Sequence, residues 1–240
     1  MANLKMLLPL CAAVLLAGPM GNARADDFNG SLDWTGFSVL LTDLDVSDGV
    51  DPSLTWLSQS TGASVLGAGG ATVNNWGPIL PASPLVFSNG LVTASAGPDM
   101  LGISGSGLHS GMGFLEAVAT RYGDFTLSAQ TRVDFTLPAS VLAAAPAGVE
   151  ILLGASMVVT GPLGAGFNSD EIGVGPGDAQ ARDLQVSFSN LDVVADDLHF
   201  SSALNVNAYP AAPIPEPGQL AMLIAGLGVV ALSLRHRRCG

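Results

Sequence analysis

Short alternations of apolar and polar residues recur through the middle of the chain, and this period of two predicts β-strands. They occupy residues 37–42, 53–58, 85–95, 114–121, 124–129, 131–137, 150–160, 184–189 and 198–208. No window of eleven residues between positions 26 and 209 has a helical period, although residues 140–145 have the composition of a single helical turn. About nine strands spaced near ten residues apart predict an all-β fold, an antiparallel two-sheet sandwich.

Turn residues separate these runs and set the expected connections. Asn89-Gly90 stands between two β-prone runs, which is the strongest short signal for a hairpin. Residues 63–73 are rich in glycine and are compatible with strand, loop or both. Residues 102–113 are also glycine-rich, but they lack the third glycine of a dinucleotide loop and the lysine of a phosphate loop. We therefore expect a flexible loop there.

The first 25 residues have the layout of a signal peptide. One positive charge, Lys5, precedes an apolar run of 12 residues, 6–17, which is too short to span a bilayer. Ala23 and Ala25 then supply small residues at positions −3 and −1 before Asp26. This pattern predicts export and cleavage by signal peptidase after Ala25; the alternative is a buried N-terminal helix.

The C-terminal end changes composition in three steps. Residues 210–219 form a proline-rich linker, residues 220–234 are apolar apart from Ser233, and residues 235–240 are basic. Fifteen helical residues cover about 22 Å against a hydrocarbon core of about 30 Å, a gap that snorkelling arginines and local thinning can close. Arginines remain on the cytoplasmic side, so residues 26–209 form a single body outside the inner membrane.

The order of these parts resembles the PEP-CTERM sorting signal of exported proteins from Gram-negative bacteria that make exopolysaccharide. The features that carry the resemblance are the Pro-Glu-Pro motif, a hydrophobic helix with two glycines and a terminal arginine cluster: Pro215, Glu216, Pro217, Gly226, Gly228, Arg235, Arg237 and Arg238. The resemblance implies a membrane-anchored precursor, recognition by an exosortase, processing near Pro-Glu-Pro, and a final place at the cell surface or outside the cell. Residues 41–54, 125–135 and 184–190 also resemble the uncharacterised β-rich bodies of such proteins.

Charge narrows the range of partners. The full chain has a net charge of −12, and charged residues make up 12% of it, about half the usual share. The body has three arginines against 19 acidic residues, which leaves it 16 charges negative. Such a body repels phosphate backbones, so nucleic acid is excluded as a partner. The two cysteines, Cys11 and Cys239, lie near the ends, so the body has no disulfide or thiolate site.

An acidic stretch after the first predicted strand is the sharpest polar cluster. Asp43, Asp45, Asp48 and Asp51 could supply oxygens to Ca²⁺, which takes six to eight of them. The spacing departs from the EF-hand, because the glycine is seventh rather than sixth and no glutamate closes the loop. A solvated hairpin turn explains the same residues, and we favour that interpretation. We assign no cofactor and no metal ligand.

Catalytic motifs are absent from the sequence. His109 and His199 are isolated, no His-Glu-x-x-His or Gly-x-Ser-x-Gly pattern occurs, and no pair is singled out among the carboxylates, which include Glu116, Glu150 and Glu171. Trp34, Trp56 and Trp76 are either core residues or a platform for stacking sugars, and core is the usual role. The sequence therefore predicts a protein that is not an enzyme.

These observations together predict an exported surface or matrix protein with a structural or exopolysaccharide- and biofilm-associated role. Its expected partners are signal peptidase and exosortase during processing, the inner membrane transiently, and exopolysaccharide. A calcium-dependent carbohydrate-binding module is the alternative function, and a secreted hydrolase is the third.

Overall fold

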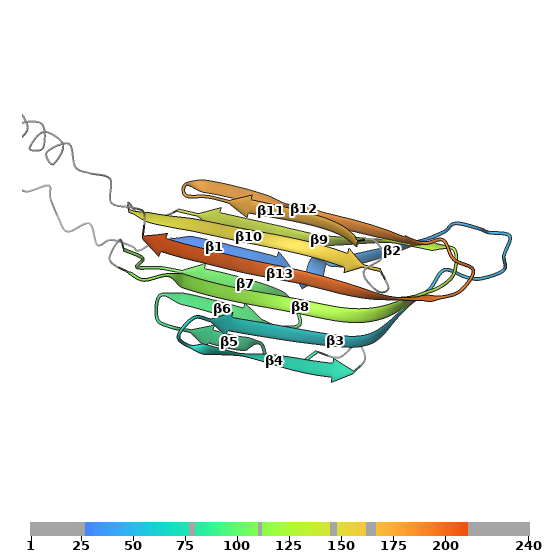
Figure 1. Ribbon diagram of the computed structural model, residues 1–240, viewed down its shortest axis with the longest axis horizontal. Helices are drawn as coiled ribbons and strands as arrows, with labels where there is room; N and C mark the ends of the chain where they lie inside the picture. Colours follow the sequence, from blue (N-terminus) through green and yellow to red (C-terminus); the bar gives the residue numbers. More distant parts are fainter. Residues whose placement is uncertain (1–26, 77–79, 110–111, 145–147, 162–166, 211–240) are drawn as a thin grey trace, which may run out of the picture.

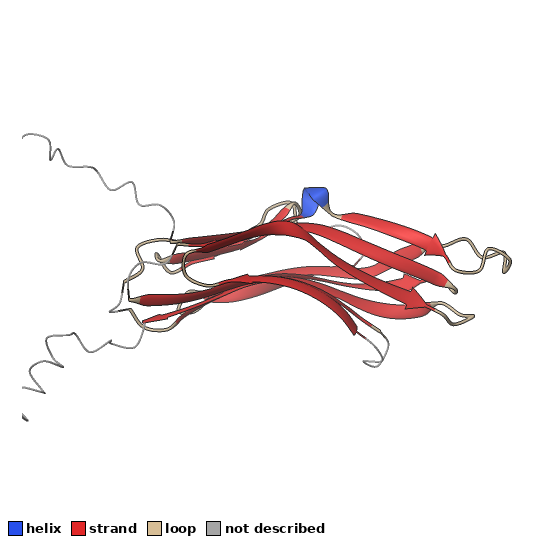
Figure 2. Ribbon diagram, turned by 90° about the horizontal axis from the view of Figure 1, so that it is seen from above, coloured by secondary structure: helices blue, strands red, loops and turns tan. Residues whose placement is uncertain are grey.

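The body of the chain forms two stacked β-sheets in a computed structural model that describes residues 27–76, 80–109, 112–144, 148–161 and 167–210. These residues contain thirteen strands and one short 3-10 helix, η1 (Trp34–Gly36) (Figure 1; Figure 2). The strands are β1 (Phe28–Asp33), β2 (Ser38–Asp43), β3 (Leu54–Val65), β4 (Gly69–Trp76), β5 (Leu85–Ser88), β6 (Val92–Ala96), β7 (Met100–Gly105), β8 (Leu115–Leu127), β9 (Thr131–Ala143), β10 (Val149–Thr160), β11 (Phe167–Val174), β12 (Asp178–Asn190) and β13 (Asp196–Pro210).

The predicted antiparallel sandwich is confirmed. Sheet A has seven strands in the order β12-β9-β1-β7-β6-β5, with β2 also paired to β9. Sheet B has six strands in the order β11-β10-β13-β8-β3-β4. The expected signal peptide, the C-terminal helix and the basic tail lie outside the described residues, and so does all of the proline-rich linker except Pro210.

Alternation along each strand sends every second side chain into the space between the sheets. In β9, for example, Val133, Phe135 and Leu137 are fully buried, while the residues between them are partly exposed. The centre is aromatic: Phe135 lies 5.1 Å from Phe200 and 5.5 Å from Phe125, ring centroid to centroid. Burial of one such ring stabilises the fold by roughly 1.5–3 kcal/mol, so this cluster holds the two sheets together.

Two adjacent segments share one side of β9. β1 pairs with residues 139–143 of β9, and β2 pairs with residues 131–136. The short helix η1 lies between them, opposite the one proline of β9, Pro138, which has no N–H to donate. Gly36 lies against this ring, because a Cβ on it would lie 2.7 Å from Cγ of Pro138. The gap between the β1 and β2 pairings along β9 therefore includes Pro138, which has no N–H for a ladder hydrogen bond.

The predicted hairpin at Asn89-Gly90 is confirmed. It joins β5 to β6, and Gly90 has a φ of +88°, which residues other than glycine rarely adopt. The Asn89 side chain closes the turn, since its Oδ1 accepts from the N–H groups of Leu91 at 3.0 Å and Val92 at 2.9 Å.

Other details differ from the sequence prediction. The described residues contain thirteen strands rather than nine. Residues 28–33, 69–76, 100–105 and 167–174 are strands outside the nine predicted runs, the run 85–95 contains two strands, and the runs 114–121 and 124–129 are one strand, β8. The expected loop at 102–113 begins inside β7, where Gly105 makes room for the ring of Phe28. Residues 140–143 continue β9, so the expected helical turn is wrong over those positions; long-range pairing with β1 and β12 decides their conformation.

Candidate functional site

The residues expected to direct export and sorting lie outside the described parts of the chain: Ala23, Ala25, Pro215, Glu216, Pro217, Arg235, Arg237 and Arg238. Trp34 and Trp56 both belong to the core; Trp34 is buried and Trp56 is partly buried against Phe125 and Phe200. The side chain of Trp76 is outside the described set. The two described tryptophans therefore form no exposed sugar-stacking platform.

Three of the four aspartates at the end of β2 and in the loop that follows it cap their own turns. Oδ1 of Asp43 accepts from the N–H of Asp45 at 2.9 Å, and Oδ1 of Asp45 accepts from the N–H and hydroxyl of Ser47 at 3.0 and 2.6 Å. Oδ1 of Asp48 accepts from the N–H of Val50 at 2.7 Å. The hydroxyl of Ser47, and then its N–H, lowers the pKa of Asp45. Nowhere in the described ranges do three or more His, Cys, Asp or Glu side chains gather as a metal site would require.

A polar cluster lies on the outer face of sheet B, where β3, β8 and β13 run side by side. Ser58 donates its hydroxyl hydrogen to Oδ2 of Asp124 at 2.7 Å, and Nδ1 of His199 lies 2.9 Å from Oδ1 of the same carboxylate. Register places the three residues in one row across the sheet. The bonds from Ser58 and then from His199 lower the pKa of Asp124.

The order of this cluster does not match that of a hydrolytic triad. In a triad the histidine lies between the nucleophile and the carboxylate, so that it can remove the hydroxyl proton. Here the carboxylate of Asp124 lies in the middle, and His199 has no contact with Ser58 among the hydrogen bonds of the described residues. This geometry suits binding of hydroxyl groups, because it presents fixed acceptors and a ring nitrogen to solvent.

A hollow of about 550 Å³ adjoins the cluster. The ring of Tyr122 borders it and stacks on His199, with ring centroids 6.3 Å apart and an interplanar angle of 24°. Its other lining residues carry hydroxyl, amide and carboxylate groups: Ser58, Gln59, Ser60, Asn74 and Asp124. An aromatic face with hydrogen-bonding groups around it is what a sugar ring requires.

Glycines open two further hollows on the same face. One, of about 260 Å³, lies over β3, β4 and β8 and is also bordered by Tyr122. At its floor, a Cβ on Gly62 would lie 3.0 Å from the hydroxyls of both Thr72 and Thr120. The absence of a side chain at Gly62 therefore deepens the surface.

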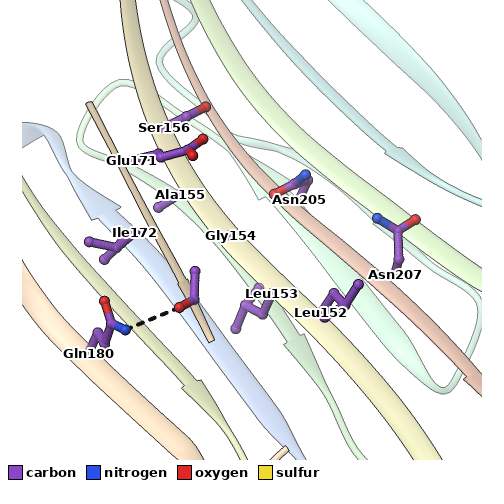
Figure 3. A pocket seen from close by; sticks show the side chains of 11 residues that line it. Leu152, Leu153, Gly154, Ala155, Ser156, Glu171, Ile172, Gln180, Asn205 and Asn207 are labelled. Carbon is purple, nitrogen blue, oxygen red and sulfur yellow. Dashed lines mark hydrogen bonds between the residues drawn. The ribbon is translucent and has the colours of Figure 1, made fainter. Parts of the chain in front are cut away.

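The other hollow, of about 470 Å³, lies over β10, β11 and β13 (Figure 3). Asn205 and Asn207 project from β13, and Gln180 reaches in from β12 and donates to the carbonyl of Gly173 at 3.1 Å. A Cβ on Gly154 would lie 2.8 Å from Oδ1 of Asn205. The amide of Asn205 therefore occupies space that a side chain at position 154 would fill.

Pairing register makes the three hollows neighbours. Tyr122 borders the first two, and Asn205 of the third is directly paired with Val118 of the second. Directly paired residues of an antiparallel sheet have Cβ atoms about 4.5–5.5 Å apart on the same face. The outer face of sheet B thus carries a continuous polar strip from β4 to β11. The sequence patterns did not predict it.

Comparison with known proteins concerns the tail rather than the strip. The family model described as the PEP-CTERM protein-sorting motif matches residues 213–238. The chain carries the PEP-CTERM sorting motif. The predicted resemblance of the tail is thereby confirmed, and the matched residues span the Pro-Glu-Pro sequence and the arginine cluster. Comparison with curated proteins gives no match, and neither does comparison with solved structures.

The motif implies export, a membrane-anchored precursor, processing by an exosortase and sorting to the surface or the outside of the cell. Within the part of the chain that the structure describes, no helix is long and apolar enough to cross a membrane. The predicted anchor at residues 220–234 lies beyond that part.

Proposed function

We propose that this protein binds a neutral exopolysaccharide along the polar strip of sheet B, which we call the glycan strip, and so becomes part of the matrix outside the cell. The continuous row of hollows on sheet B supports this function. It combines amide and hydroxyl groups with the face of Tyr122, the groups that hydrogen-bond sugar hydroxyls and pack against sugar C–H surfaces.

The charges along the strip favour a neutral polymer. Glu171 lines one hollow and Asp124 lines another. None of the described residues that line these three hollows is an arginine. Arg132 pairs with Asp134 on sheet A, and Arg182 pairs with Asp170 at the edge between β11 and β12. A polyanion would meet carboxylates without compensating cations, whereas a neutral glycan would meet hydrogen-bond acceptors.

The two other functions considered from the sequence have weaker support. A calcium-dependent module needs oxygens directed at one point, and the aspartates after β2 instead cap separate turns. A hydrolase needs an activated nucleophile or a carboxylate pair, and the row of Ser58, Asp124 and His199 has the carboxylate in the middle. The mature protein is thus proposed to act by binding, after signal peptidase and exosortase have processed the precursor at the inner membrane.

Affinity electrophoresis of the exported protein tests the proposal. The gels contain the neutral polysaccharide fraction washed from the producing cells, and parallel gels contain polygalacturonate. We expect retardation by the neutral fraction, and a loss of about tenfold in affinity for Tyr122→Ala, since removal of a central aromatic contact costs about 1–2 kcal/mol. Thr136→Ala and Gln185→Ala, on the outer face of sheet A, are matched controls that should bind normally. Equal retardation of Tyr122→Ala and these controls would contradict the proposal.

A further inference from the structure

One arginine of the body points into the sandwich. Arg121 lies on the inner face of β8, directly paired with Thr61 of β3 and Ser202 of β13. Its terminal nitrogens donate to the carbonyl of Pro98 and to Oε1 of Gln59, both at 2.9 Å. An arginine is rarely buried without a carboxylate partner, so its position requires an explanation.

Aromatic rings surround this guanidinium. Its Cζ lies 3.8 Å from the ring centroid of Trp34, which is close enough for a strong cation–π contact. Beside it is a pocket of about 180 Å³, room for about six water molecules at their share of liquid volume. The pocket is lined by Trp34, Phe37, Trp56, Gln59, Arg121, Tyr122 and Phe200.

Two side chains that line the pocket have N–H groups without an acceptor in the described ranges. Nε1 of Trp34 is buried without a hydrogen-bond partner there, and Trp34 is 8% exposed. Arg121 has five N–H groups, and its hydrogen bonds within the described residues use two. Buried polar groups are nearly always paired, so this set indicates a missing acceptor.

Arg121 is the one charged side chain among the described lining residues of the pocket, and the carboxylate of Asp99 acts on it without forming an ion pair. Burial lowers the pKa of Arg121 to about 10, against the opposing effect of Asp99, so the guanidinium stays protonated at neutral pH. The other two body arginines differ, since Arg132 and Arg182 form ion pairs with Asp134 and Asp170. Among the described arginines, Arg121 alone has its charge without a carboxylate within ion-pair distance.

We propose that this pocket binds a small monovalent organic anion, with its carboxylate on Arg121 and the indole N–H of Trp34. A guanidinium presents a planar fork that matches a carboxylate, and the surrounding ring faces accept the less polar body of the ligand. One guanidinium balances one carboxylate, and the nearby Asp99 and the acidic body disfavour a second negative charge inside the pocket. The carboxylate belongs either to a free organic acid or to a uronic acid unit of a polysaccharide.

Calorimetric titration of the full exported protein tests this site with galacturonate, and with galactose as the neutral analogue. We expect one galacturonate per chain, a change in tryptophan fluorescence, and no binding of galactose at the same concentrations. Arg121→Met should weaken binding about tenfold to a hundredfold, the range of a charged hydrogen bond. Trp34→Phe, which keeps a ring and removes the N–H, should weaken it about tenfold, because the lost hydrogen bond is made to an ionised carboxylate. Arg132→Met is the matched control and should bind normally.

The alternative outcomes separate the two sources and decide the proposal. Binding of acetate without binding of polygalacturonate assigns the pocket to free organic acids, whereas saturation by polygalacturonate fragments assigns it to uronic acids. Galactose binding as well as galacturonate, no binding of any carboxylate to the wild-type protein, or full affinity in both Trp34→Phe and Arg121→Met would each overturn it. Gln59 and Tyr122 border both this pocket and the glycan strip, so ligand and variant separate the two proposals. Arg121→Met should leave retardation by the neutral polysaccharide unchanged, and binding of polygalacturonate that Arg121→Met abolishes is assigned to the pocket and not to the strip.

Discussion

Replacement of Gly123 by alanine should destabilise the sandwich through one aromatic side chain. Gly123 is a buried residue of β8, paired with Gln59 and Phe200. A Cβ at this position would lie 2.8 Å from Cε3 of Trp56 and still closer to Cζ3, well inside van der Waals contact. The indole cannot simply move away, because Phe125 and Phe200 hold it at centroid distances of 5.3 and 5.9 Å.

The size of the effect follows from two opposing terms. Overpacking of a filled core costs about 1–3 kcal/mol, and alanine recovers about 0.5–1 kcal/mol relative to glycine inside a strand. A Cβ this close to a ring puts the overpacking cost in the upper half of its range, about 2–3 kcal/mol, so the net loss in the free energy of unfolding is about 1–2.5 kcal/mol. For a domain of this size, about 2–4 °C per kcal/mol converts it to a fall in Tm of about 2–10 °C.

Thermal melts of the exported protein measure this fall. Gly173→Ala is the control, since Gly173 is also a strand glycine but a Cβ on it would find its nearest atom, the carbonyl oxygen of Leu153, at 3.9 Å. Trp56→Phe in the Gly123→Ala background should restore part of the loss, because the smaller ring vacates the contested space. An unchanged Tm in Gly123→Ala, or strictly additive effects in the double variant, would refute the reasoning.

Two further predictions concern the acidic groups. The Arg182 guanidinium lowers the pKa of Asp170 from 3.8 to about 2. The stability that this ion pair adds is therefore complete above about pH 4 and is lost as the pH falls toward 2. Asp170→Asn should lower Tm at about pH 6, and the Tm values of the variant and the wild type should converge near pH 2. A constant difference in Tm down to pH 2 would contradict this. Because the carboxylate of Asp45 caps its own turn, we expect divalent cations only to screen the acidic charge. Millimolar Ca²⁺ and Mg²⁺ should then raise Tm equally, both in the wild type and in Asp45→Asn. A rise in Tm that is specific to Ca²⁺ and that the variant loses would show a metal site.

Much of the sandwich could be predicted because its information is local. Alternation marked β8, β9, β10 and β13, whose side chains are buried one in two. Asn89-Gly90 marked its hairpin, since the turn requires a positive φ that glycine supplies. The sorting tail was equally local, because its three parts follow one another in a fixed order within residues 213–238.

The strands that were missed depend on contacts far away in sequence. β7 contains Gly102 and Gly105, which signal a loop when read alone. Gly105 is nevertheless paired with Phe28 of β1, and the phenylalanine ring occupies the space where a side chain would be. Glycine here is a packing requirement rather than a turn signal, and only the tertiary structure distinguishes the two.

The two candidate sites were missed for different reasons. The glycan strip is partly visible in the sequence, because β13 carries polar residues at alternate positions, including His199, Asn205 and Asn207, on its outer face. Its assembly with β8 and β10 depends on register, which the sequence alone does not supply. Arg121 carried no signal, since an isolated arginine in a strand is usually exposed and here it reaches the core beneath η1.

The direction of the strands relates the glycan strip to the sorting tail. β1 begins and β13 ends at the same end of the sandwich, while the acidic loop after β2 projects from the opposite end (Figure 1). The sorting motif begins at residue 213, three positions after Pro210, so attachment through the tail holds the body by the first end. A strand of 13 residues is about 43 Å long at about 3.3 Å per residue, and the acidic loop therefore extends that far from the attachment. Asn207 lies near the attached end and His199 lies eight residues further out, so the strip, which crosses sheet B from β4 to β11, also extends away from the anchored end.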